Sequence, residues 1–180
     1  MKTVFFITAL AMALVLPGNS SAAKHGNAGN PESRQQTTAS EPIMSSAALA
    51  GLHRLEILLQ KLNDPDPFVR VEAVQALGEI QKEQSLLSVC NCLTDENIYV
   101  RAYAAEALGK IGRIDLSLTL LRLISALDDP SPYVRAMMVA ALGELQDERA
   151  AEPIRKLLHD EDESVRAMAK WALNQIETSQ

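Results

Sequence analysis

One motif recurs four times in this chain of 180 residues, and it constrains the fold more than any other feature. Each copy has an aspartate, a short turn, a Val-Arg pair and then an alanine-rich amphipathic stretch. The arginines of the four copies are Arg70, Arg101, Arg135 and Arg166, which are 31, 34 and 31 residues apart. A repeat of this length indicates a supersecondary unit that stacks on its neighbours, because one unit alone cannot bury its apolar face. The sequence therefore predicts a solenoid.

Each unit is predicted to be a pair of helices, because its apolar residues follow the 3,4 spacing of a helix face. The second helix of each pair starts after a residue that caps helices well, and in two units a proline occupies the first helical position. The expected caps are Asp66, Asn97, Ser131 and Asp162, before second helices over 67–80, 98–111, 132–145 and 163–176. The expected first helices are 45–62, 85–93, 115–127 and 148–159. The predicted fold class is all-α, an α-solenoid of about four stacked helical hairpins.

Glycines recur inside the second helices at Gly78, Gly109 and Gly143. A glycine inside a helix costs about 1 kcal/mol relative to alanine, and close approach of the next helix pair would offset that cost. The fourth unit has Asn174 at this position, and Lys170 where the other units have valine or alanine. Polar residues at packing positions suit a terminal unit, so the solenoid is expected to end there.

At these residues the chain resembles the HEAT-repeat superfamily, in particular the short HEAT-like repeats of phycobilisome bilin lyases. The resemblance rests on the pattern of Asp, a proline-containing turn, Val-Arg and Ala-x-x-Ala-Leu-Gly-x-Ile. This pattern stands here from Asp64 to Ile80 and, with changes, in three successors. It implies a HEAT-like repeat domain over 43–177. The signatures of ankyrin and tetratricopeptide repeats are not present.

The residues before the repeats differ in composition. Lys2, the apolar run 4–16 and the small residues that follow it predict a secretory signal peptide over 1–23. The alternative is an uncleaved anchor, for which the apolar run is short. The polar residues 24–42 predict a disordered linker, and 178–180 a short tail. The chain is therefore expected to be exported, to a bacterial periplasm or beyond, without a stable membrane span after cleavage.

The charge pattern argues against two classes of partner. The net charge is −6, and no run of lysine or arginine occurs. A nucleic-acid-binding protein needs clustered positive charge to neutralise phosphates, so no nucleic-acid partner is expected. An anionic membrane surface would likewise need a polybasic cluster.

Each unit carries an aspartate six residues before its arginine. The pairs are Asp64 and Arg70, Asp95 and Arg101, Asp129 and Arg135, and Asp160 and Arg166. We expect a ladder in which the aspartates accept hydrogen bonds from helix N–H groups and from the arginines, so that successive units are joined. The alternative is a row of arginines for anionic ligands, which an aspartate within reach of each arginine disfavours.

Cys90 and Cys92 lie two residues apart in an expected helix, so their side chains point about 200° from each other and an intramolecular disulfide would require unwinding. The simpler interpretation is two small apolar residues, at least one of them buried. Export to an oxidising compartment keeps an intermolecular disulfide or a soft-metal site open as alternatives.

Second-helix positions outside the apolar stripe are the candidates for partner contact. In the HEAT-like solenoids that this chain resembles, the second helices line the concave face. The candidate binding residues are Glu72, Tyr103, Glu106, Met137, Glu144, Met168 and Trp171, a series that runs from acidic to apolar along the chain. Tyrosine, methionine and tryptophan make adaptable or anchoring contacts in binding grooves. The alternative is that Met168 and Trp171 fold over the open C-terminal end as a hydrophobic cap.

The sequence contains no Ser/His/Asp, Cys/His or multi-His constellation, so no catalytic or metal-binding residue is assigned and no cofactor is expected. One relative holds two irons through His-Glu pairs, but here His53 precedes Arg54 and His159 precedes Asp160. The predicted function is a non-catalytic interaction module of the cell envelope that binds a protein or peptide on its concave face. The alternative is an accessory or lyase-like factor that handles a tetrapyrrole or metal cofactor, an analogy at the level of the fold.

Overall fold

The computed structural model describes residues 45–178, and every one of its regular elements is helical. The predicted signal peptide and linker, and the last two residues of the predicted tail, lie outside this range. The α-helices are α1 (Ser46–Lys61), α2 (Pro67–Ile80), α3 (Glu83–Asn91), α4 (Ile98–Ile111), α5 (Leu116–Ser125), α6 (Pro132–Leu145), α7 (Ala151–Lys156) and α8 (Glu163–Glu177). The expected all-α solenoid of four helical hairpins is confirmed.

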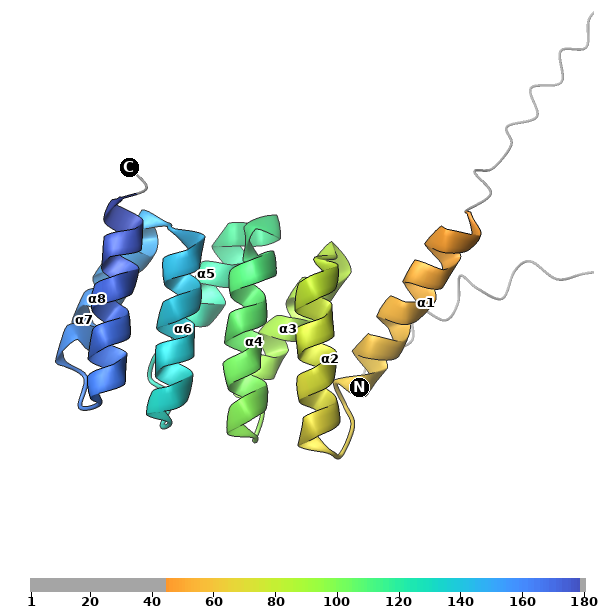
Figure 1. Cartoon of the computed structure of the whole chain (residues 1–180), viewed down its shortest axis with the longest axis horizontal. Coiled ribbons are helices and arrows are strands. Elements are labelled where there is room, and N and C mark those ends of the chain that lie inside the picture. Colours follow the sequence, from red (N-terminus) through yellow and green to blue (C-terminus); the bar gives the residue numbers. More distant parts are fainter. Residues whose placement is uncertain (1–44, 179–180) are drawn as a thin grey trace, which may run out of the picture. The chain divides into compact units, whose positions relative to one another are not determined.

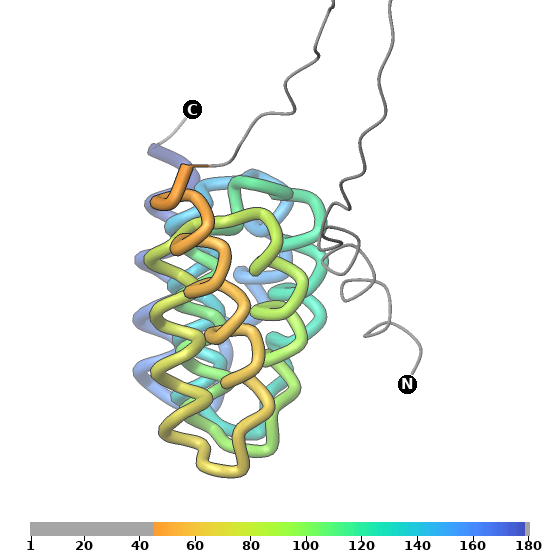
Figure 2. Tube along the Cα trace, turned by 90° about the vertical axis from the view of Figure 1, so that its right-hand side faces the viewer, coloured from red at the N-terminus to blue at the C-terminus, as the bar shows by residue number. Residues whose placement is uncertain are grey.

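The helices form two rows. The second helices α2, α4, α6 and α8 stand side by side in one row, and α3, α5 and α7 lie behind them (Figure 1). Figure 2, which looks at the array from its α1 end, shows the two rows one behind the other. Each second helix packs directly on the next, whereas each first helix mainly contacts the second helix of its own unit. One continuous core therefore runs along the row of second helices.

Polar side chains start most of the second helices as expected. The caps that form are Asp66, which accepts from the N–H of Phe68, Asn97, which accepts from Tyr99, and Asp162, which accepts from Ser164 and Val165. Ser131 makes no such hydrogen bond, contrary to the prediction, although α6 begins directly after it. Pro132 opens that helix with a fixed φ and needs no cap for its missing N–H.

The fourth first helix is shorter than the sequence pattern suggests. The expected helix over 148–159 is divided into a 3₁₀ turn (Glu148–Ala150), α7 and a second 3₁₀ turn (Leu157–His159). Pro153 explains the late start of the α-helix, because proline is tolerated only in the first turn, where its missing N–H has no partner to lose. A helix that began at 148 would place this proline in its interior.

The first unit is packed on one side only. The leucines of α1 share one helix face, but Leu55 is buried while Leu49 and Leu52 are exposed. No earlier unit covers this end within the described residues, and the N-terminal half of α1 stands away from α2 (Figure 1). A helix face that meets no partner keeps its apolar side chains in water, whatever its periodicity indicates.

The glycine row allows the close approach that the sequence predicts. A Cβ placed on Gly78 would lie 3.0 Å from the Cβ of Ala107, and one on Gly143 would lie 2.9 Å from the Cα of Ala172. In both cases the neighbour belongs to the second helix of the next unit. Small residues thus let the second helices pack backbone against backbone, and this expectation is confirmed.

Candidate binding face

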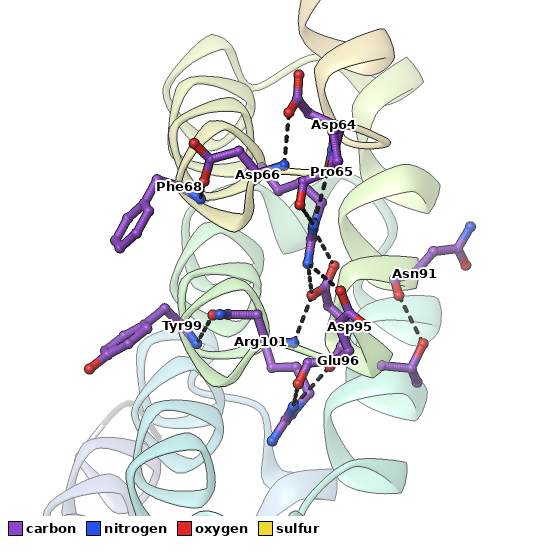
Figure 3. Close-up of polar contacts among 12 residues, drawn as sticks. Asp64, Pro65, Asp66, Phe68, Asn91, Asp95, Glu96, Tyr99 and Arg101 are labelled. Carbon is purple, nitrogen blue, oxygen red and sulfur yellow. Dashed lines mark hydrogen bonds and ion pairs between the residues drawn. The ribbon is translucent and has the colours of Figure 1, made fainter.

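The ladder arginines connect one unit to the next. Arg135 donates from Nε to Asp160 Oδ2 and from Nη2 to Asp160 Oδ1, both at 2.8 Å, and from Nη1 to the backbone oxygen of Asp129 at 2.9 Å. Arg70 repeats this arrangement with Asp95 and Asp64, and Arg101 with Asp129 and Asp95. Each arginine therefore binds the carbonyl of its own unit's aspartate and the carboxylate of the following unit's aspartate. Part of this chain of contacts is visible in Figure 3.

The carboxylates of the ladder also accept hydrogen bonds within the turns before the second helices. Asp95 Oδ1 also accepts from the N–H of Asn97 at 2.9 Å, and the other three aspartates accept from the residue two positions later in the same way. Asp95, Asp129 and Asp160 thus each shape the turn before a second helix and bind the arginine of the preceding unit, whereas the carboxylate of Asp64, in the first unit, only shapes its turn within the described residues. Because these arginines are almost fully occupied by such contacts, with Arg135 only 7% exposed, they do not form a row for anionic ligands.

Arg166, in the last unit, has only half of the usual partners. It donates from Nη1 to the backbone oxygens of Asp160 and Glu161, like the other arginines in their own units. Among the described residues no later aspartate meets it, since α8 is the last helix. This difference makes Arg166 a natural comparison for the ladder.

Both cysteines are buried and unpaired with each other. Cys90 and Cys92 are free thiols, and the Cys92 thiol donates to the backbone oxygen of Ser88 at 3.3 Å. Burial raises the pKa of Cys92 to about 11 and also raises the pKa of Cys90. Thiolates are the reactive and metal-binding form, so this environment suppresses both properties.

We expect neither thiol to react with a thiol reagent in the native protein at pH 8, and both to react in denaturant. The physical reason is that a raised pKa lowers the thiolate fraction at that pH and burial blocks access. Time-resolved thiol titration with and without guanidinium chloride measures this. Rapid labelling of one thiol in native protein would contradict it.

The predicted binding residues all lie on α2, α4, α6 and α8, but they are not equally accessible. Glu72, Glu144 and Trp171 are exposed, whereas Glu106 is half-buried. The remaining three, Tyr103, Met137 and Met168, are half-buried and pack against the core. These three support the surface from beneath and present only part of their side chains to a partner.

Trp171 turns toward the preceding unit. The Cβ position of Gly143 lies 2.7 Å from the indole Cζ3, so the indole ring of Trp171 packs over the glycine of α6. The ring is 41% exposed. It therefore covers the junction between α6 and α8 and contributes to the row of second helices, which favours the binding-face interpretation over a cap on the C-terminal end.

An aromatic row that was not among the predicted binding residues lies at the start of the second helices. Phe68, Tyr99 and Tyr133 precede the repeat valine in three units and are 71%, 49% and 44% exposed. The rings of Tyr99 and Tyr133 meet edge to face, with centroids 6.4 Å apart. Figure 3 shows Phe68 and Tyr99 projecting from α2 and α4 on the side away from the ladder. The signal was present in the alignment of the four repeats, because this position is aromatic in three of them.

The charges on this face are mostly negative. Lys110 Nζ contacts Glu79 Oε1 at 2.8 Å and Glu106 Oε1 at 3.1 Å, which raises the pKa of the lysine. Glu144 lies close to Gly109, and burial together with the nearby Glu106 carboxylate raises its pKa. The face therefore combines exposed aromatic rings with an excess of carboxylates.

Two hollows lie by the turns and first helices. One, of about 490 Å³, is lined by Cys90, Asp95, Arg122 and Asp129, among others. In the part of the chain that the structure describes, no three metal-ligating side chains converge, and no helix is long and apolar enough to cross a bilayer.

Paired helices stacked in register and joined by an Asp–Arg ladder define an α-helical repeat protein. The chain belongs to the HEAT-repeat family, since the model of HEAT repeats matches residues 55–122 and 120–180. No curated protein matches it in sequence.

Several solved structures share the fold. Human deoxyhypusine hydroxylase in complex with glycerol has a TM-score of 0.62 at 20% identity, over 73% of this chain and 46% of that chain. The complex of CpcE and CpcF of phycocyanin lyase from Nostoc sp. PCC7120 has a TM-score of 0.59 at 21% identity, over 70% of this chain and 88% of that chain. An engineered protein has a TM-score of 0.54 at 22% identity, over 73% and 66%. This chain thus spans less than half of the hydroxylase, and at these identities the likeness concerns the fold alone.

Proposed function

We propose that this protein is a non-catalytic interaction module of the cell envelope that binds a protein or peptide on its second-helix face. The observation that carries the proposal is the exposed aromatic row on α2, α4 and α6, together with the exposed Trp171 on α8. Aromatic side chains at a surface are the residues that most often anchor a protein partner. They are expensive to expose, and the core does not need rings that are half in water.

The packing of the array supports the same face. The second helices pack on one another more extensively than the first helices do, which is the arrangement expected of a solenoid whose second helices line the inner, concave side. A concave row of four helices offers a partner segment contacts with several units at once. Export to the envelope is part of the proposal and is supported by the apolar run and small residues near the N-terminus.

The test uses a photo-crosslinking amino acid at two exposed positions. One replaces Glu144 on α6, within the face, and the other replaces Leu121 on α5, in the row of first helices. We expect a discrete crosslinked partner from cell-envelope extract with the first and none with the second. Adducts from Leu121 alone would contradict the assigned face.

The double variant Tyr103→Ala with Trp171→Ala separates binding from capping. We expect it to lose the crosslinked partner, because both side chains contribute to the face. Intact binding combined with a lower melting temperature would instead show that these residues serve stability. A purified protein that absorbs visible light or carries a stoichiometric metal would favour cofactor handling over the proposed module.

A further inference from the structure

We propose that Tyr99, Tyr103 and Tyr133, together with Glu106, form a recognition site for an arginine or lysine side chain of the partner. The inference rests on the proposed function and narrows it, because it specifies a protein segment with a basic residue between apolar ones. It concerns the middle of the second-helix face, on α4 and α6.

The tyrosine rings are inclined to each other. Tyr99 and Tyr133 meet edge to face at an interplanar angle of 63°, so their faces are not stacked on each other. Tyr103 lies one turn after Tyr99 on the same side of α4, where residues four apart are neighbours. Both Tyr99 and Tyr133 are about half exposed. An aromatic face attracts a cation through the ring quadrupole, and two or three faces around one point do so together.

The carboxylate beside the rings adds to this preference. Glu106 follows Tyr103 by three residues, which places it on the same side of α4, and it contacts Lys110 through Oε1 at 3.1 Å. The phenol of Tyr133 lies within electrostatic reach of Tyr103, Glu106 and Tyr99, and its pKa is raised by burial and by these neighbours. Burial disfavours any charge at this phenol, whereas the Glu106 carboxylate attracts a cation placed beside the rings.

The charge of the whole face agrees with a basic partner. Its carboxylates include Glu72, Glu79, Glu106 and Glu144, and Lys110 is the basic residue beside them. A second exposed lysine of the described second helices, Lys170, lies on α8. The basic residues Arg113, Arg122, Arg149, Arg155 and Lys156 lie outside the second helices. An acidic partner would meet repulsion here, whereas a basic one is attracted and oriented.

The experiment compares two blocked peptides that differ only in charge. One alternates leucine with arginine, and the other has citrulline, which is neutral and nearly isosteric, in place of each arginine. Binding to the full chain is followed through the tyrosine ring signals in NMR titrations. We expect the arginine peptide to bind about tenfold more tightly, and this preference to weaken as salt is raised.

Matched variants assign the preference to the site. Tyr133→Phe keeps the ring face and is expected to retain the arginine preference, whereas Tyr133→Leu keeps an apolar side chain and is expected to lose it. Glu106→Gln is expected to reduce the preference, and Glu83→Gln, which removes the same charge from α3 in the other row, is expected to leave it unchanged. Unchanged melting curves of all four variants establish that the fold is intact.

Three outcomes would overturn the inference. Equal affinity for the two peptides would show that the face binds only their apolar groups. The proposed binding module would then remain, but without a cation site. An arginine preference that survives in Tyr133→Leu would place the cation elsewhere. Ring signals that shift with protein concentration in the absence of peptide would show that a second copy of the chain occupies the site.

Discussion

Replacing Arg135 by alanine is expected to lower the free energy of unfolding by about 3 kcal/mol or more, the range seen when one partner of a buried ion pair is removed. The change would leave the Asp160 carboxylate, whose side chain is 6% exposed, without its two hydrogen bonds from the guanidinium. It would also leave the backbone oxygen of Asp129 without the donor at Nη1. Chemical denaturation followed by circular dichroism measures the loss.

Arg166→Ala is the matched control. Arg166 occupies the same place in its repeat and makes the same bonds to its own unit, but no carboxylate of a later unit among the described residues. We expect its loss to cost about 1 kcal/mol. Equal effects of the two substitutions would show that the contact between units contributes nothing, and an unchanged denaturation midpoint for Arg135→Ala would remove the ladder as a source of stability.

The same pair contributes to acid sensitivity. The hydrogen bond from Arg135 lowers the pKa of Asp160 below its unfolded value. A carboxyl group with a depressed pKa stabilises the fold above its unfolded pKa of about 3.9, and this contribution is lost as the pH falls through the folded pKa. Arg135→Ala should therefore destabilise the protein less at pH 2 than at pH 7.

Gly143→Ala is expected to destabilise the protein by about 1–3 kcal/mol, although alanine is the better helix former. The new methyl group would lie 2.9 Å from the Cα of Ala172 and 2.7 Å from the ring of Trp171. The contact with Ala172 involves backbone, so α8 as a whole would have to move. Thermal and chemical unfolding give the size of the effect.

Gly51→Ala provides the opposite expectation. Gly51 lies in α1, and a Cβ placed there meets nothing within 4 Å. This substitution should raise stability by about 0.5–1 kcal/mol through helix propensity alone. If both substitutions shifted stability in the same direction, close approach of the helices would not explain the glycine row.

Much of the fold could be predicted from the sequence because it is local and repeated. The cap, the Val-Arg pair and the apolar stripe are properties of single helices, and each recurs in register, so the four second helices were placed within a residue at Pro67–Ile80, Ile98–Ile111, Pro132–Leu145 and Glu163–Glu177. The exposed stripe of α1 and the divided helix around Pro153 were harder to predict. They depend on what lies next to a helix, or on a residue that the repeat does not share.

The candidate site was predicted less completely, for a related reason. The sequence identified the residues that vary between repeats, and so it found Tyr103 and Trp171 but not the row that begins at Phe68. That row occupies a position that varies little, directly before the repeat valine, and the helix period places it outside the apolar stripe. The exposure of these aromatic side chains depends on where the turn ends and the helix begins, and on the distance to the next helix.

The residues alone therefore determined the architecture of this protein: four helical hairpins, their order, three of the four second-helix caps and the small residues between them. The tertiary structure decided which side chains of neighbouring units contact each other. It showed that Arg70, Arg101 and Arg135 each reach the aspartate of the following unit, 25 or 28 residues away, and that Tyr99 meets Tyr133 across two helices. Local periodicity acts along one helix, whereas these contacts form only when neighbouring units stack at a given distance and angle.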